Sequence, residues 1–75
     1  MEYLDELTFA DYFRAEQEIY RAIISAAVMC RWIAEHDTPP TKQEAGQMAL
    51  EIDRQMCEAW GEIYSHAVLN WLDDR

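Results

Sequence analysis

The feature that most constrains this chain is a Pro39-Pro40 pair that separates two long segments of helical periodicity. Proline donates no backbone hydrogen bond, and it pushes the preceding residue away from helical angles, so no helix can run through the pair. A threonine followed three residues later by an acid, the pattern of a helix start, occurs once on each side. These two patterns are Thr8 with Asp11 and Thr41 with Glu44. We therefore predict two helices that fold back on each other.

At 75 residues the chain has room for one domain. We predict an all-α fold, an αα-hairpin of two long antiparallel helices within a single domain over 1–75. Its expected parts are an N-terminal arm over 1–7, a first helix over 8–36, a turn over 37–41 and a second helix over 42–73. Met1 to Leu7 mix apolar and acidic side chains, so the arm could also pack on the helices as an extra turn.

The apolar content exceeds what one hairpin can hide, because 51% of the residues are hydrophobic. Between Ile19 and Ala34 the first helix is apolar round most of its circumference, which is typical of a helix buried on two sides. We therefore predict a homodimer that completes a four-helix bundle. The residues predicted for the dimer interface are Tyr20, Ile23, Cys57, Gly61 and Val68. Gly61 would let a facing helix approach closely.

Fifteen acidic residues against six basic ones give a formal net charge of -9. This field repels phosphate, so we expect no direct nucleic-acid or membrane binding, and it attracts basic protein surfaces. The acids predicted on outer faces are Glu18, Glu35, Glu51, Asp53, Glu58 and Glu62. They either imitate the phosphates of a duplex or only keep an apolar-rich protein soluble.

The two cysteines, Cys30 and Cys57, should lie too far apart along the hairpin for a disulfide. We predict buried free thiols, which favours a reducing compartment such as the cytoplasm. The N-terminus carries acids where an export signal has basic residues. The uncharged stretch from Ala22 to Cys30 is nine residues long, well short of the ~20 that span a bilayer.

Hairpin geometry brings Glu16 opposite Glu62, with His66 one turn away, so these three are weak candidates for a metal site. Di-metal bundles use Glu-x-x-His pairs on facing helices, a spacing this chain lacks, and a hydrogen-bonded trio is the alternative. Neither cysteine has a histidine within a turn, and the two glycines form no phosphate-binding loop. We therefore expect no enzymatic activity and no cofactor.

Large aromatic side chains are typical anchors of protein interfaces, and the chain has three tryptophans. The main apolar stripe of the first helix includes Ile19, Ile23, Ala26, Cys30 and Ile33. The strip that holds Trp32 lies beside this stripe, so we expect it to contact a partner. The predicted partner-binding residues are Ile24, Val28, Met29, Trp32, Glu35, Trp60, Tyr64 and Trp71.

From these features we expect a small acidic protein-binding module that inhibits or modulates its target. The target would be a regulator or a basic nucleic-acid-binding protein. In size and charge alone, the chain is similar to short inhibitors that bacteriophages encode against host proteins. Three alternatives stay open: a nucleic-acid-mimicking inhibitor of a DNA- or RNA-binding complex, a metal-carboxylate bundle and a structural assembly protein.

Overall fold

The structure is a computed structural model that describes residues 7–75. It contains α1 (Phe9–Glu35), α2 (Lys42–Glu58) and α3 (Trp60–Asp73). The described part of the chain is all-helical, which confirms the predicted fold class. The predicted arm over 1–7, apart from its last residue, lies outside the described residues.

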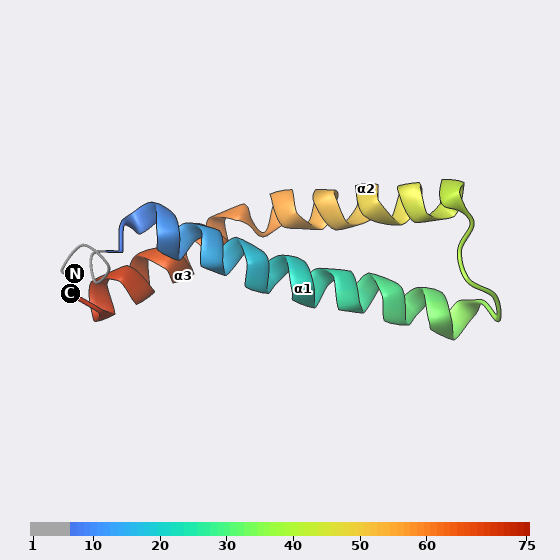
Figure 1. The fold of residues 1–75 in the computed structure, drawn as a ribbon, viewed down its shortest axis with the longest axis horizontal. Helices are drawn as coiled ribbons and strands as arrows, with labels where there is room; N and C mark the ends of the chain where they lie inside the picture. Colours follow the sequence, from blue (N-terminus) through green and yellow to red (C-terminus); the bar gives the residue numbers. More distant parts are fainter. Residues whose placement is uncertain (1–6) are drawn as a thin grey trace.

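The three helices form a long, thin molecule with principal extents of 51 × 26 × 18 Å. α1 runs along most of its length, α2 returns beside α1 after the turn, and α3 continues past the start of α1 (Figure 1). Both α2 and α3 contact α1, and they contact each other much less. α1 is therefore the element on which the rest of the fold is built.

Both helix starts follow from their predicted threonine and acid. The Asp11 carboxylate accepts the Thr8 backbone N–H at 2.8 Å, and the Glu44 carboxylate accepts that of Thr41 at 2.9 Å. The Thr41 hydroxyl in turn accepts the Glu44 backbone N–H at 3.2 Å. These bonds to Thr8 and Thr41 hold the pKa of each acid below its usual value. α1 thus begins at Phe9 and α2 at Lys42, each directly after its threonine, and residues 36–41 join the two helices.

The predicted single helix over 42–73 is wrong, because the second arm bends at Ala59. There ψ is 3°, whereas a helix needs about -42°. Hydrogen bonds continue across the bend, from the Ala59 N–H to the Gln55 carbonyl at 3.0 Å and from the Ile63 N–H to the Ala59 carbonyl at 2.9 Å. We attribute the bend to packing, because it brings α3 onto α1 with Ile63 and Ala67 fully buried.

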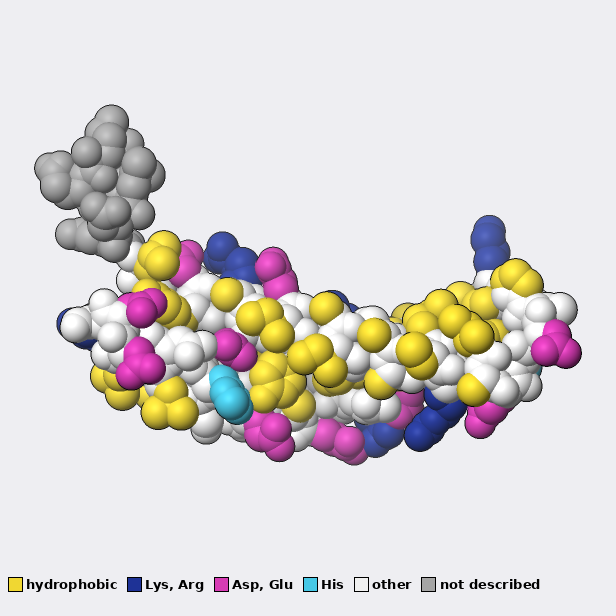
Figure 2. Space-filling model, turned by 90° about the horizontal axis from the view of Figure 1, so that it is seen from below, with side chains coloured by type: hydrophobic (Ala, Val, Ile, Leu, Met, Phe, Trp, Pro, Cys, Tyr) yellow, Lys and Arg dark blue, Asp and Glu magenta, His cyan; other side chains and the backbone are white. Residues whose placement is uncertain are grey.

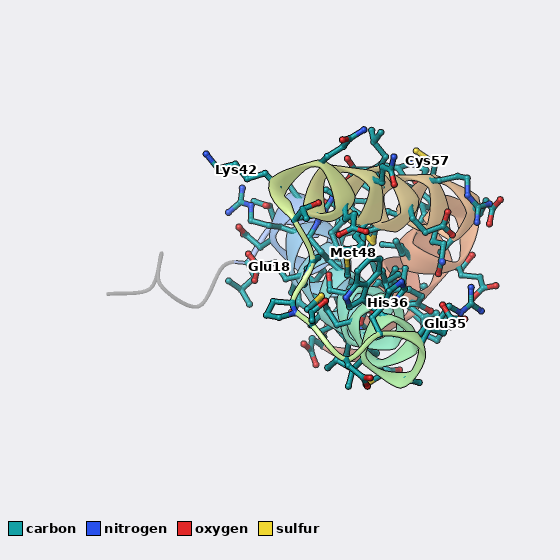
Figure 3. The ribbon with its side chains drawn as sticks, turned by 90° about the vertical axis from the view of Figure 1, so that its right-hand side faces the viewer. Glu18, Glu35, His36, Lys42, Met48 and Cys57 are labelled. Carbon is teal, nitrogen blue, oxygen red and sulfur yellow. The ribbon has the colours of Figure 1, made fainter. Side chains whose placement is uncertain are left out.

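The described residues hold a small apolar core. Its four members are Met48, Met56, Ile63 and Ala67, and Ile63 is the one large side chain that is 0% exposed. Met48 points from α2 toward the middle of the hairpin, whereas Cys57 points away from it (Figure 3). Most of the apolar side chains in residues 7–75 therefore remain in contact with solvent.

α1 faces α2 with the strip that holds Trp32, which the sequence analysis expected to lie outside the hairpin. Ile24, Val28 and Trp32 are half-buried and line hollows together with α2 residues. Ile23 and Ile33, which belong to the main stripe, are 63% and 68% exposed. The spacing explains this difference in exposure. Tyr20, Ile24, Val28 and Trp32 recur every four residues, and such a row is inclined to the helix axis. It therefore stays in contact with a neighbouring helix that crosses at an angle.

The prediction that both cysteines are buried is wrong for a single copy of this chain. Cys30 and Cys57 are free thiols, as predicted, but both are exposed. Each lies on an apolar strip that faces away from the hairpin interior.

Candidate protein-binding surfaces

A row of exposed apolar residues lies on α1. We call it the α1 seam and define it as Ile19, Ile23, Ala26, Cys30 and Ile33, all of which are exposed. The spacing alternates between four and three residues, the heptad pattern by which one helix contacts another. Figure 2, which views the molecule from the α1 side, shows hydrophobic side chains in a row along its length. This row is a ready contact surface for a further helix.

A second surface forms where the start of α1 meets α3. Phe13 packs edge-to-face on Trp60 at 4.9 Å between ring centroids and on Tyr64 at 5.8 Å. Phe9 makes similar contacts with Tyr64 at 5.3 Å and with Trp71 at 5.9 Å. Trp60 is 46% exposed and Tyr64 is 50% exposed. We call Trp60 and Tyr64, with the two phenylalanines behind them, the aromatic patch.

The aromatic patch is held in place on several sides. The Tyr12 hydroxyl donates to the Asp74 carboxylate at 2.8 Å, which ties α1 to the end of α3 and raises the pKa of Tyr12. The Arg75 guanidinium lies 4.4 Å from the centre of the Trp71 ring. The Trp60 and Tyr64 rings, which pack edge-to-face on Phe13, lose little conformational entropy when a partner covers them, which favours them as anchors.

The acids of α2 do not form an unbroken negative row. Arg54 binds Glu51 and Glu58, and Arg21 lies 3.2 Å from Asp53. The hydrogen bonds from Arg54, with a further one from Gln55, lower the pKa of Glu51 to about 2. Two of the six predicted outer acids, Glu51 and Glu58, therefore share a single cation, and a third is paired with Arg21.

Trp32 lies at the turn end of the hairpin, where its ring stacks on His36 with centroids 3.6 Å apart. Its indole N–H donates to the Thr38 carbonyl at 3.3 Å. Trp32 also lines a hollow between α1 and α2 that has Met48 at one wall and Glu44 and Glu51 at another. Its half-buried ring therefore already contacts other residues of the hairpin on several sides. Among the other predicted partner-binding residues, Met29 and Glu35 are exposed.

The weak metal candidates do not come together. The Glu16 carboxylate is buried and accepts a hydrogen bond from the Asn70 amide at 2.7 Å. Tyr20 lies near this place, with its ring 5.9 Å from that of His66. Partial burial raises the pKa of Tyr20, and the charges of Glu62 and Glu16 add to the effect. Within residues 7–75 no three histidine, cysteine or acidic side chains gather as metal ligands do.

The residues predicted for the dimer interface are spread over more than one face. Ile23 and Cys57 are exposed on different helices, and Val68 is half-buried on α3. A Cβ atom added to Gly61 would meet nothing within 4 Å, so this chain itself makes no close approach there. Sequence reasoning placed Ile19, Ala26 and Cys30 on one stripe with Ile23 and Ile33, but it missed that this stripe faces outward. Their spacing identifies the stripe and does not indicate which side of α1 faces α2.

Comparison with known proteins gave no match, whether to family models, to curated proteins or to solved structures. In the part of the chain that the structure describes, the helices are too short or too polar to cross a bilayer.

Proposed function

We propose that this chain is a non-catalytic protein-binding module that acts as a homodimer and inhibits or modulates its target. One observation carries the proposal. Ten large hydrophobic side chains are exposed among the described residues, whereas the apolar core there has four members. Large exposed apolar patches on proteins in water mark interaction sites, because a partner that covers such a patch removes its apolar surface from water.

The aromatic patch is the surface best suited to a target other than a second copy. Trp60 and Tyr64 each expose about half of their surface, and the phenylalanines behind them provide a rigid base. Trp and Tyr dominate binding energies when a partner's pocket encloses them. The net charge of -9 suits a target groove with a basic rim. Trp32 stays a prediction, but its contacts with His36 and Thr38 make it less available.

Nucleic-acid mimicry receives less support from the arrangement of charges. A phosphate mimic needs a row of free negative charges, and Arg54 and Arg21 interrupt that row on α2. The apolar mode and the mimicry mode differ in their response to salt. Charge mimicry weakens steeply as salt rises, whereas binding through an apolar surface changes little.

The test is affinity capture from a bacterial lysate with the tagged 75-residue chain, washed at low and at high salt. We expect a captured protein to survive the high-salt wash. We also expect Trp60→Ala to reduce its recovery at least ~10-fold, the effect of losing one binding hot spot. The matched control is Leu50→Ala, because Leu50 is also large and exposed but lies on α2, outside the aromatic patch.

Two results would count against this proposal. Release of the captured protein by salt, with no effect of Trp60→Ala, would favour charge mimicry. Equal losses with Trp60→Ala and Leu50→Ala would show that the aromatic patch has no special role.

A further inference from the structure

We propose that the α1 seam is where a second copy of this chain binds, with the two α1 helices antiparallel about a two-fold axis between Ile23 and Ala26. The inference rests on the homodimer of the proposed function and names its interface. It leaves the aromatic patch uncovered for the target.

The charge distribution selects this face for self-association. Two copies that each carry a net charge of -9 repel each other, so they approach most easily where the charge is lowest. α1 has four acids and three bases, a net charge of -1, whereas residues 42–75 have seven acids and three bases, a net charge of -4. No charged residue at all occurs between Arg21 and Arg31. The α1 seam crosses this uncharged stretch.

The spacing of the α1 seam fits a helix as its occupant. Residues that alternate at four and three positions form a stripe that stays in line with a partner helix over successive turns. Beside the stripe, Ala15, Ala22 and Met29 are also exposed and uncharged, so the partner helix meets no unpaired charge on that flank. A strand or an irregular loop would not match this period.

The order of large and small residues fits a second copy in the antiparallel direction. With the axis between Ile23 and Ala26, Ile23 of one copy meets Ala26 of the other, and Ile19 meets Cys30. These layers each pair one large residue with one small residue, which fills the space evenly, and Ile33 lies beyond them at each end of the interface, level with position 16 of the other copy. The parallel alternative stacks Ile on Ile, Ala on Ala and Cys on Cys, so two thick layers are followed by two thin ones. The antiparallel pairing also opposes the two helix dipoles.

The α1 seam is short for an interface. From Ile19 to Ile33 it is about 21 Å long, because the two residues are 14 positions apart on the helix. Standard stable interfaces bury about 800 Å² on each partner, more than one helix face of that length supplies. We therefore expect a dimer with a micromolar dissociation constant, which sedimentation can follow.

The first test is sedimentation equilibrium of the full-length chain and two charge variants. Ile23→Lys places a cation in two layers of the dimer, so we expect its dissociation constant to rise at least ~100-fold. Leu50→Lys is the matched control, because Leu50 is as exposed as Ile23 but lies on α2. We expect the control to dimerise like the unaltered chain. Far-UV circular dichroism checks that both variants keep their helices.

The second test is disulfide trapping, which uses a milder change. In a chain with Ile19→Cys and Cys57→Ser, mild oxidation should link residue 19 of one copy to Cys30 of the other, because residues in one layer lie within disulfide reach. The Cys57→Ser chain alone should not crosslink, because antiparallel pairing places the two Cys30 residues 11 positions apart, about 16 Å at the helical rise. Mass spectrometry of the linked peptides identifies the pairs.

The outcomes separate the levels of the proposal. A dimer that survives Ile23→Lys, or one that Leu50→Lys disrupts equally, would overturn the α1 seam as the interface and leave the homodimer standing. A link between two Cys30 residues would overturn the antiparallel direction. A chain that stays monomeric at every concentration would overturn both this inference and the homodimer. Target binding through Trp60 would remain open to its own test.

Discussion

Replacing Ile63 with alanine tests whether so small a core stabilises the fold. Ile63 is 0% exposed, so the substitution leaves a cavity between α3 and α1 as well as losing the transfer free energy of the missing carbons. Such changes cost about 2–5 kcal/mol. A chain of 75 residues has a free energy of unfolding of about 4–11 kcal/mol. Ile63→Ala should therefore remove about half of the total stability.

The assay is urea unfolding followed by far-UV circular dichroism, with the free energy of unfolding taken from the midpoint and slope. Leu50→Ala is the control, since its side chain is 70% exposed and its loss should cost less than about 0.5 kcal/mol. Measurements at two protein concentrations separate unfolding from dissociation. A loss for Ile63→Ala no larger than that for Leu50→Ala would refute the view that this core stabilises the hairpin.

Three further substitutions or conditions probe local contacts. Thr41→Ala removes the hydroxyl that accepts the Glu44 N–H, so urea unfolding should show a loss of about 1 kcal/mol, and an unchanged midpoint would argue against the cap. Asn70→Ala leaves the buried Glu16 carboxylate without its amide partner, which should cost about 1–3 kcal/mol in the same assay, and no loss would show that water replaces the bond. Because folding lowers the pKa of Glu51 from 4.5 to about 2, its stabilisation is present at neutral pH and is lost as the pH falls through that window. The melting temperature of the unaltered chain should therefore fall more steeply there than that of Glu51→Gln, and parallel profiles would contradict this assignment.

The outline of the fold could be predicted from the sequence because its signals are local. Pro39 and Pro40 stop a helix whatever surrounds them, and a threonine with an acid three residues later starts one. The bend at Ala59 has no such signal, because alanine favours a continuous helix. It arises from how α2 and α3 each pack on α1, which the local sequence does not encode.

The orientation of α1 could not be predicted from its apolar pattern. Apolar residues cover most of its circumference, so periodicity allowed either strip to face α2. Specific contacts distinguish the two: Glu16 meets Asn70, and Trp32 meets Thr38. Asn70 lies on α3 and Thr38 lies in the turn, so neither partner belongs to the helix whose apolar pattern was analysed. The aromatic patch was predicted in part, since Trp60 and Tyr64 were named, but the phenylalanines that support them were not.

The bend at Ala59 also means that the two halves of the second arm need not open together. α3 contributes the fully buried Ile63 and Ala67, whereas α2 contributes Met48 and Met56, which keep slight contact with solvent. Local opening is easier where fewer apolar atoms are buried, so amide hydrogens in α2 should exchange faster than those in α3. Each opening of α2 would uncover Ile24, Val28 and Trp32 for a short time. The apolar surface of this protein therefore has a permanent part and a transient part, and the transient part grows with temperature.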